Sequence, residues 1–251
     1  MRFFILYILV CIQLNAIAQS KQPVYHLGST FVFSNQIRTD QISFSDSSGF
    51  SSDLAINNKY GISELNDYAF GLNYQKQNSV YTFNYHYFQE NIISKQKLSL
   101  AIQKQLSSNW YTRVSIHYNK EKYIRHSNSE IGSSVALLYT YNNKIFLQNT
   151  ISNIPINGAV SQTQNRTAIQ YKIDDFIATT FQYSVGDEMD GAIGLLYSKK
   201  KYSLHLEHHL NRKIFGVGFG INTGPIFINF IFYTHQILGN SYSTHLKWQE
   251  L

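Results

Sequence analysis

Cysteine, proline and long apolar runs are scarce in this chain, and each scarcity excludes a class of structure. The 251 residues include one cysteine, Cys11, and three prolines. Cys11 lies in an N-terminal segment that we expect to be removed, so a disulfide-stapled fold is excluded for the rest. Beyond that segment no apolar run reaches the length of a membrane helix. A mature chain that crosses a membrane must therefore cross it with strands.

Charge is also sparse, and it is not concentrated. Charged residues make up 14% of the chain, and 21 basic against 15 acidic residues give a net charge of +6 and a pI near 9.2. The basic residues are scattered instead of forming one basic stretch, so we expect no nucleic-acid binding. Aromatic residues are plentiful, with 19 Tyr and 17 Phe, yet the mean hydropathy is only −0.23.

The first 18 residues have the pattern of a secretory signal peptide. Met1-Arg2 precedes an apolar run over 3–14, and Ala16-Ile17-Ala18 supplies a cleavage site before Gln19. A positive start, a short apolar core and an A-x-A exit are typical of export signals and too short for a spanning helix. The residue before Cys11 is Val10, not the small residue that lipidation requires. We expect cleavage near Ala18-Gln19 and one domain over 19–251.

Period-two alternation runs along nearly the whole of 19–251 and predicts strands. The stretch SVYTFNYHYFQ over 79–89 alternates aromatic with small polar residues. Comparable segments occur at 24–34, 66–75, 97–105, 110–119, 132–141, 145–153, 165–173, 177–185, 192–198, 202–210, 214–221, 225–235 and 241–250. Many approach the roughly 10 residues that a tilted strand needs to cross a bilayer. We therefore predict an all-β, closed antiparallel transmembrane β-barrel, up-and-down, of about 14 strands, with 12–16 allowed.

The predicted connections alternate in length, as they do in outer-membrane barrels. The short ones fall at 76–79, 106–109, 142–144, 174–175, 199–201 and 222–224, and the longest at 35–65, 120–131 and 154–164. Residues 35–65 are numerous enough to fold inward and narrow the pore. Only about five residues would precede the first strand, which leaves no room for an N-terminal plug domain.

A secreted soluble β-sandwich is the main alternative fold. Its aromatic row would face a core and its polar row would face water. Sandwich strands average about 5–6 residues, shorter than those predicted here. The polar row also offers Gly, Ala, Ser, Asn and Gln, which suit a crowded lumen better than an exposed sheet face.

In a barrel, aromatic residues near strand ends should form girdles at the two membrane interfaces. The candidates are Tyr68, Tyr74, Tyr81, Tyr87, Trp110, Tyr118, Tyr197, Tyr202, Tyr242 and Trp248. The ordinary preference of Tyr and Trp for strands explains part of the same pattern.

The opposite row should line the lumen. Its candidates are His86, Gln103, Arg113, His117, Arg166, Gln170, Lys172, Gln182, His205, Glu207, His209, His245 and Lys247. Ionisable groups in such an interior must be hydrated or paired. Cationic residues outnumber Glu207 in this set, which is compatible with a weak anion preference. A self-paired network that only props the barrel open or blocks it explains the set equally well.

No motif for catalysis, metal or cofactor binding stands out. The stretch LHLEHHL contains His205 and His209 on one strand face, too far apart to hold one ion without a third ligand. The acidic stretch at 187–190 fits a solvated loop better than a cation site. Nucleotide, hydrolase and zinc-protease motifs are missing from the sequence. We expect no enzyme activity, cofactor or metal, and keep as an alternative a hydrolase assembled from separate strands around His205 or His209.

The last forty residues resemble the closing strands of outer-membrane barrels from bacteria that use type IX secretion. The resemblance rests on Gly216, Gly218, Gly220, His235, Leu238 and Gly239. It implies kinship with fatty-acid-channel-like and secretion-associated barrels. One departure is the terminus, which reads Trp248-Gln249-Glu250-Leu251. Barrel-insertion machinery commonly recognises a terminal aromatic residue, and Leu251 is not aromatic.

Two functions follow from these expectations. The first is a non-enzymatic outer-membrane channel or passive transporter of small solutes. The alternative is a structural component of an envelope secretion or surface-attachment complex, and a hydrolase comes third. The expected partners are the lipid bilayer, lipopolysaccharide and, for the structural alternative, other envelope proteins.

Overall fold

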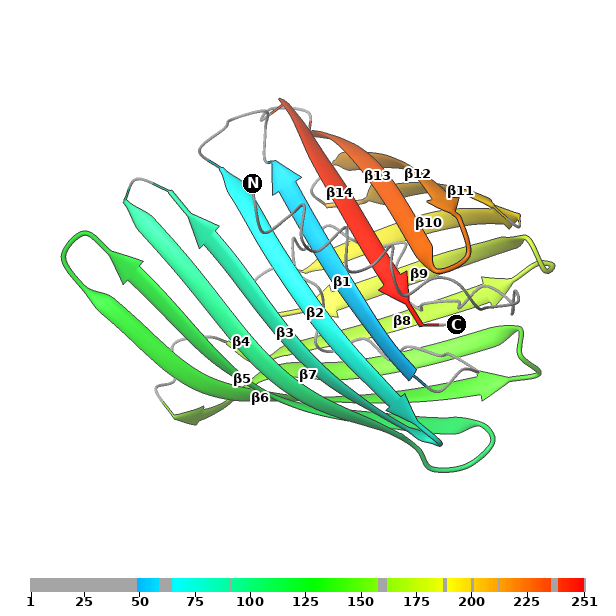
Figure 1. Cartoon of the computed structure of the whole chain (residues 1–251), viewed down its shortest axis with the longest axis horizontal. Coiled ribbons are helices and arrows are strands. Elements are labelled where there is room, and N and C mark those ends of the chain that lie inside the picture. Colours follow the sequence, from blue (N-terminus) through cyan, green and yellow to red (C-terminus); the bar gives the residue numbers. More distant parts are fainter. Residues whose placement is uncertain are drawn as a thin grey trace.

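The computed structural model describes residues 49–58, 65–90, 92–157, 162–186, 189–199, 201–211, 213–235 and 239–250. Over these residues the chain forms a closed barrel of fourteen antiparallel strands in sequence order (Figure 1). The strands are β1 Gly49–Asn58, β2 Asn66–Lys76, β3 Ser79–Gln89, β4 Ile93–Gln105, β5 Trp110–Tyr123, β6 Ser127–Tyr141, β7 Ile145–Asn157, β8 Gln164–Lys172, β9 Ile177–Val185, β10 Asp190–Lys199, β11 Tyr202–His209, β12 Ile214–Asn222, β13 Ile226–His235 and β14 Gly239–Gln249. The described residues include no helix long and apolar enough to span a membrane.

The barrel closes where β1 meets β14. The two strands pair from Ser51 opposite Gln249 to Asn58 opposite Tyr242. Because every strand therefore has two partners, the sheet has no free edge, as a structure surrounded by lipid requires. The predicted closed antiparallel barrel of about 14 strands is confirmed, and the sandwich alternative is wrong.

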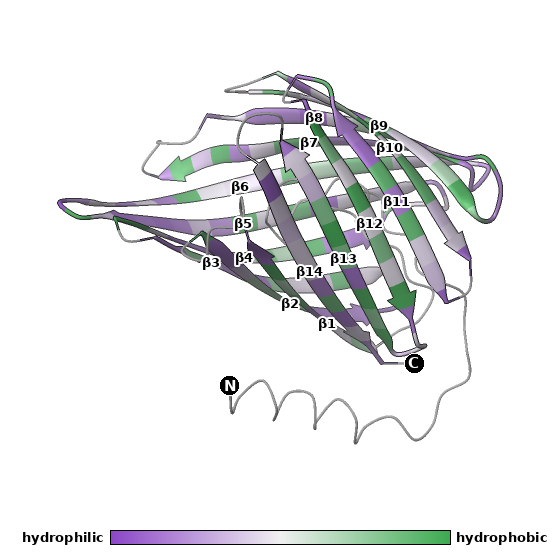
Figure 2. Cartoon of the chain, turned by 90° about the horizontal axis from the view of Figure 1, so that it is seen from above, coloured by the Kyte–Doolittle hydropathy of each residue, from purple (hydrophilic) through white to green (hydrophobic). Residues whose placement is uncertain are grey.

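Alternating side chains give the sheet an apolar outer face and a polar inner face (Figure 2). On β5, Val114 and Ile116 are about half exposed, whereas Ser115 and His117, which alternate with them, are buried. The other strands repeat this division. A soluble protein rarely exposes apolar surface of this extent, so the outer face is suited to hydrocarbon.

The predicted girdle residues all lie on the outer rows, and the strand register separates them by height. Tyr74, Tyr81, Trp110, Tyr197, Tyr202 and Trp248 lie beside the short turns, and Tyr68, Tyr87, Tyr118 and Tyr242 lie towards the other end. We call these the lower and the upper girdle, and the outer apolar surface between them the belt. Two girdles of aromatic side chains, one on each side of an apolar band, match the two interfaces of a bilayer.

The first strand is where the sequence prediction was wrong. The predicted strand at 24–34 lies outside the described residues, and the predicted loop over 35–65 contains β1. Its sequence GFSSDLAINN hides the alternation, because Ser52 faces outward beside Trp248 and Asp53 faces inward. The described barrel thus begins at Gly49, and the argument that only about five residues precede it no longer holds.

The predicted short turns agree with the structure within about one residue. In the turn between β6 and β7, Asn142 and Asn143 both have φ near +50°, and Lys144 N donates to Tyr141 O at 3.0 Å. Asn tolerates this left-handed conformation better than most residues, which explains the Asn pair.

The predicted loop over 120–131 shrinks to 124–126, because β5 continues to Tyr123 and β6 starts at Ser127. Here the outer rows carry Gln96, Lys120 and Ser129, so these strand ends lie above the belt. We call residues 93–97, 119–123 and 127–130 the projecting segment; its strands reach beyond their neighbours (Figure 1).

Candidate functional site: the inner wall

The residues predicted to line the lumen all lie on the inward rows. They come from β3 (His86), β4 (Gln103), β5 (Arg113, His117), β8 (Arg166, Gln170, Lys172), β9 (Gln182), β11 (His205, Glu207, His209) and β14 (His245, Lys247). The strand order therefore spreads them around the barrel instead of gathering them at one point. Most are buried: Arg113 is 3% exposed and Glu207 2%. Whether they contact a passing solute stays a prediction.

The inner wall also carries carboxylates that the sequence analysis missed. Asp53, Asp67 and Asp190 face inward and are buried, alongside the predicted Glu207. Asp53 was missed because β1, the strand that carries it, was predicted to be part of a loop. Asp67 and Asp190 lie at strand ends, and Asp67 shares the inward row of Ala69 and Gly71, so its position was available from the alternation.

At the height of the belt, charge on the described inner wall divides into two arcs, while above it Lys95, Glu121 and Glu130 also face inward on β4, β5 and β6. Arg113, Arg166 and Lys172 lie on β5 and β8. Asp190, Glu207, Asp53 and Asp67 lie on β10, β11, β1 and β2, with Lys247 opposite Asp53. We call them the basic arc and the acidic arc. Since the strand order places them on different sides of the barrel, the wall does not present one sign of charge.

Each aspartate of the acidic arc has a histidine on the neighbouring strand. His245 Nε2 lies 3.4 Å from Asp53 Oδ1, and His86 Nε2 lies 3.6 Å from Asp67 Oδ1. Cross-strand neighbours at this spacing support each other in a sheet. In these two pairs the imidazole lies beside the carboxylate at a distance longer than an ordinary hydrogen bond.

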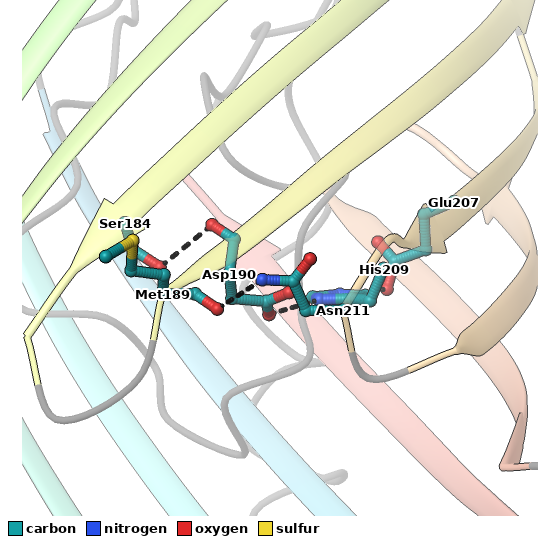
Figure 3. A network of polar contacts seen from close by, with 6 residues as sticks. All are labelled: Ser184, Met189, Asp190, Glu207, His209 and Asn211. Atoms are coloured by element: carbon teal, nitrogen blue, oxygen red, sulfur yellow. Dashed lines mark hydrogen bonds and ion pairs between the residues drawn. The ribbon is translucent and has the colours of Figure 1, made fainter.

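The third pair is the tightest and belongs to a small network at the end of the barrel away from the short turns (Figure 3). His209 Nδ1 lies 2.9 Å from Asp190 Oδ2, and His209 Nε2 lies 3.7 Å from Glu207 Oε1. Ser184 Oγ donates to the backbone oxygen of Asp190 at 3.3 Å, and Asn211 Nδ2 donates to Met189 O at 2.6 Å. These bonds tie the adjoining ends of β9, β10 and β11 together.

This network does not have the geometry of a hydrolase triad. An Asp–His pair activates a serine only when the hydroxyl meets the second imidazole nitrogen. Here that nitrogen faces Glu207, and Ser184 is bonded to a carbonyl. Among the described residues no group of three or more His, Cys, Asp or Glu side chains could hold a metal ion.

A glycine stripe on β12 shapes the wall beside this network. A Cβ on Gly218 would lie 2.0 Å from the His205 ring, and a Cβ on Gly216 would lie 2.7 Å from the Tyr233 ring. Side chains from β11 and β13 therefore lie flat across β12. The resemblance motif singled out these glycines, and the structure assigns them a packing role.

Above the belt, the projecting segment is held by exposed polar contacts. Lys95 Nζ lies 2.7 Å from Glu121 Oε1, and Tyr123 donates to Glu121 Oε2 at 2.7 Å. Partial burial alone would raise the pKa of Glu121, but the hydrogen bonds from Lys95 and Tyr123 and the charge of Lys95 outweigh it and lower that pKa. The bond to Glu121 raises the pKa of Tyr123.

Comparison with known proteins places the fold among outer-membrane barrels. The CymD monoaromatic hydrocarbon channel superposes with a TM-score of 0.56 at 8% identity, over 80% of this chain and 88% of CymD. Omp33, an outer membrane protein of Acinetobacter baumannii, gives 0.55 at 8% identity, over 81% and 98%. A mutant porin of Rh. blastica gives 0.50 at 7% identity, over 80% and 99%.

No protein-family model matches the sequence, and no curated protein matches it. At such low identities the similarity shows the fold alone. None of the three structures is described as a secretion component, so the type IX part of the resemblance stays a prediction.

Proposed function

We propose that this protein is a passive outer-membrane channel for small solutes. The observation that carries the proposal is a closed fourteen-strand barrel whose outer face is apolar and whose inner face is polar and ionisable. Fourteen strands lie between the eight that side chains fill and the sixteen or more that leave an aqueous channel. The similarity to CymD and to a porin supports the same function.

The crowded inner wall sets the expected size of the conductance. Side chains such as Arg113 and Glu207 lie along the wall and are nearly covered. We therefore expect small single-channel currents in planar bilayers instead of those of a wide general pore. Protein that is folded, as judged by its shifted electrophoretic mobility before boiling, but electrically silent would contradict the proposal and favour the structural alternative.

The two arcs allow a sharper test with a matched pair of variants. Lys172→Gln removes a cation from the basic arc, and Asp190→Asn removes an anion from the acidic arc. If ions pass between the arcs, the zero-current potential in a salt gradient shifts towards cation selectivity in the first variant and towards anion selectivity in the second. Equal potentials in both variants and the parent chain would place the ion path elsewhere.

The presence of both arcs also revises the weak anion preference expected from sequence. Four described carboxylates face inward at the height of the belt, and Glu121 and Glu130 do so above it, where the sequence analysis had counted one. We propose that the parent chain discriminates weakly between small anions and cations, and the same measurement decides this point.

A further inference from the structure

The outer face of β7 and β8 carries a cluster of amide side chains within the mainly apolar belt, where the other polar residues, such as Ser133, Thr179 and Thr244, are single hydroxyls. It consists of Asn149, Asn165 and Thr167, which we call the amide patch. Asn149 lies between Leu147 and Ile151 on β7, and Leu137 lies opposite it on β6. Each of these three neighbours is about two-fifths exposed on the outer surface. The patch therefore reaches into the belt.

The patch satisfies only part of its own hydrogen-bonding capacity. Asn149 Nδ2 donates to Asn165 Oδ1 and to Thr167 Oγ1, each at 3.0 Å. An amide has two donors and an acceptor with two lone pairs, so Asn149 Oδ1 and the Nδ2 of Asn165 still need partners. The described residues supply none. Lipid chains cannot supply them either, and leaving a polar group unbonded in hydrocarbon costs free energy.

The upper girdle is incomplete over this face. The upper girdle takes its aromatic residues from β2, β3, β5 and β14, and β9 adds Tyr183 at a similar height. At that height the outer rows of β6, β7 and β8 carry Ile131, Ile151 and Asn165 instead. Tyr and Trp normally anchor a barrel at the headgroup level. The outer rows of β10 and β11 also carry no Tyr or Trp at that height, so it is the amide patch that distinguishes β7 and β8.

We propose that this face is the interface of a homodimer, with the amide patch at its centre. Two copies inserted the same way into one membrane are related by a two-fold axis along its normal. Such an axis brings each patch opposite itself at the same depth, as isologous interfaces require. A free acceptor beside a free donor is complementary to its own copy, whereas an anionic headgroup would prefer cations to neutral amides.

The test uses single cysteines, because Cys11 is the one cysteine of the sequence and Cys11→Ala removes it. In that background, Asn165→Cys is treated with a short bis-maleimide in isolated outer membranes. The matched control is Thr244→Cys, which faces outward on β14, on the far side of the barrel. We expect a covalent species of twice the monomer mass from Asn165→Cys and none from Thr244→Cys. Equal yields, or a product of another mass, would overturn the proposal.

A second measurement separates an interface from a polar patch that the membrane merely tolerates. The parent chain and the Asn149→Leu, Asn165→Leu double variant are each weighed by native mass spectrometry from lipid nanodiscs. We expect a dimer for the parent and a monomer for the variant, with the heat-shifted mobility of a folded barrel retained in both. A monomeric parent, or a variant that remains dimeric, contradicts the proposal.

Discussion

The walls formed by β4–β6 and by β11–β13 share one outer belt but differ inside. On β11–β13 the glycines of β12 let His205 and Tyr233 lie flat against the sheet. On β4–β6 the inner row carries Lys97, Arg113 and His117, and only Gly132 admits a ring in this way. On both walls the outer residues must be apolar because they face the bilayer. The inner residues are not under this constraint, so the two walls can differ inside.

The largest effect should come from a charge placed in the shared belt. Ile116→Arg puts a guanidinium on the outer row of β5, which should cost about 2–4 kcal/mol of folding free energy near mid-membrane. Ser129→Arg on neighbouring β6 lies in the projecting segment and should change stability by no more than about 0.5 kcal/mol. Urea unfolding in lipid vesicles measures both. Similar costs would show that the belt does not end below Ser129.

The next largest loss of stability should come from adding a methyl group to the inner row of each wall. Gly218→Ala places a Cβ 2.0 Å from His205 ring atoms, and Gly132→Ala places one 2.5 Å from His117 Nε2. Overpacking of this kind costs about 1–3 kcal/mol, and we expect the larger loss at Gly218. Adding His205→Ala to Gly218→Ala should recover most of it. If the double variant is no more stable than Gly218→Ala alone, the flat histidine is not the cause.

A smaller effect is expected on lipid binding, which should depend on outward lysines of the projecting segment more than on lysines beside the short turns. Lys120 and Lys122 face outward just above the belt. A surface lysine near anionic headgroups contributes about 1 kcal/mol. Replacing both with Gln should lower the amount of lipopolysaccharide that native mass spectrometry finds bound, whereas Lys199→Gln beside a short turn should not. If both variants retain the same amount of lipopolysaccharide, these lysines do not contribute to the lipid contact.

The smallest effect concerns acidification of the projecting segment. Because the folded pKa of Glu121 lies below its ordinary value of 4.5, its contacts stabilise the segment above that pH and are lost as the pH falls through the folded pKa. Amide hydrogen exchange around Glu121, corrected for its intrinsic pH dependence, should lose protection there. Glu121→Gln should lose this added pH dependence. An unchanged dependence in that variant would assign it to another group.

The fold was predictable because its cause repeats along the sequence. Because the belt faces hydrocarbon, the strands that form it carry an apolar outer row. The alternation around Tyr81, Ile116 and Phe219 is therefore enough to predict that they face outward. β1 was missed because Ser52 interrupts that row, and the projecting segment was missed because polar residues such as Lys120 and Glu121 occupy both of its rows. Neither region lacks strand geometry. In both regions the apolar row that marks a strand in the sequence is interrupted.

The inner wall was only partly predictable, for a related reason. Alternation assigns a side chain to the inner row but says nothing of which strand lies across from it. His209 was expected inside, yet its contact with Asp190 depends on the register of β10 and β11. The amide patch was missed in the same way, because Asn149 and Asn165 meet only when β7 pairs with β8.

The seam between β1 and β14 has a consequence for how the protein is made. Ser51 can pair with Gln249 only after all the intervening strands have been made, and joining points so distant along the chain is entropically expensive and slow. Until that moment the growing sheet carries two open edges that invite pairing with other chains. Pairing of β1 with β14 removes both edges in one step.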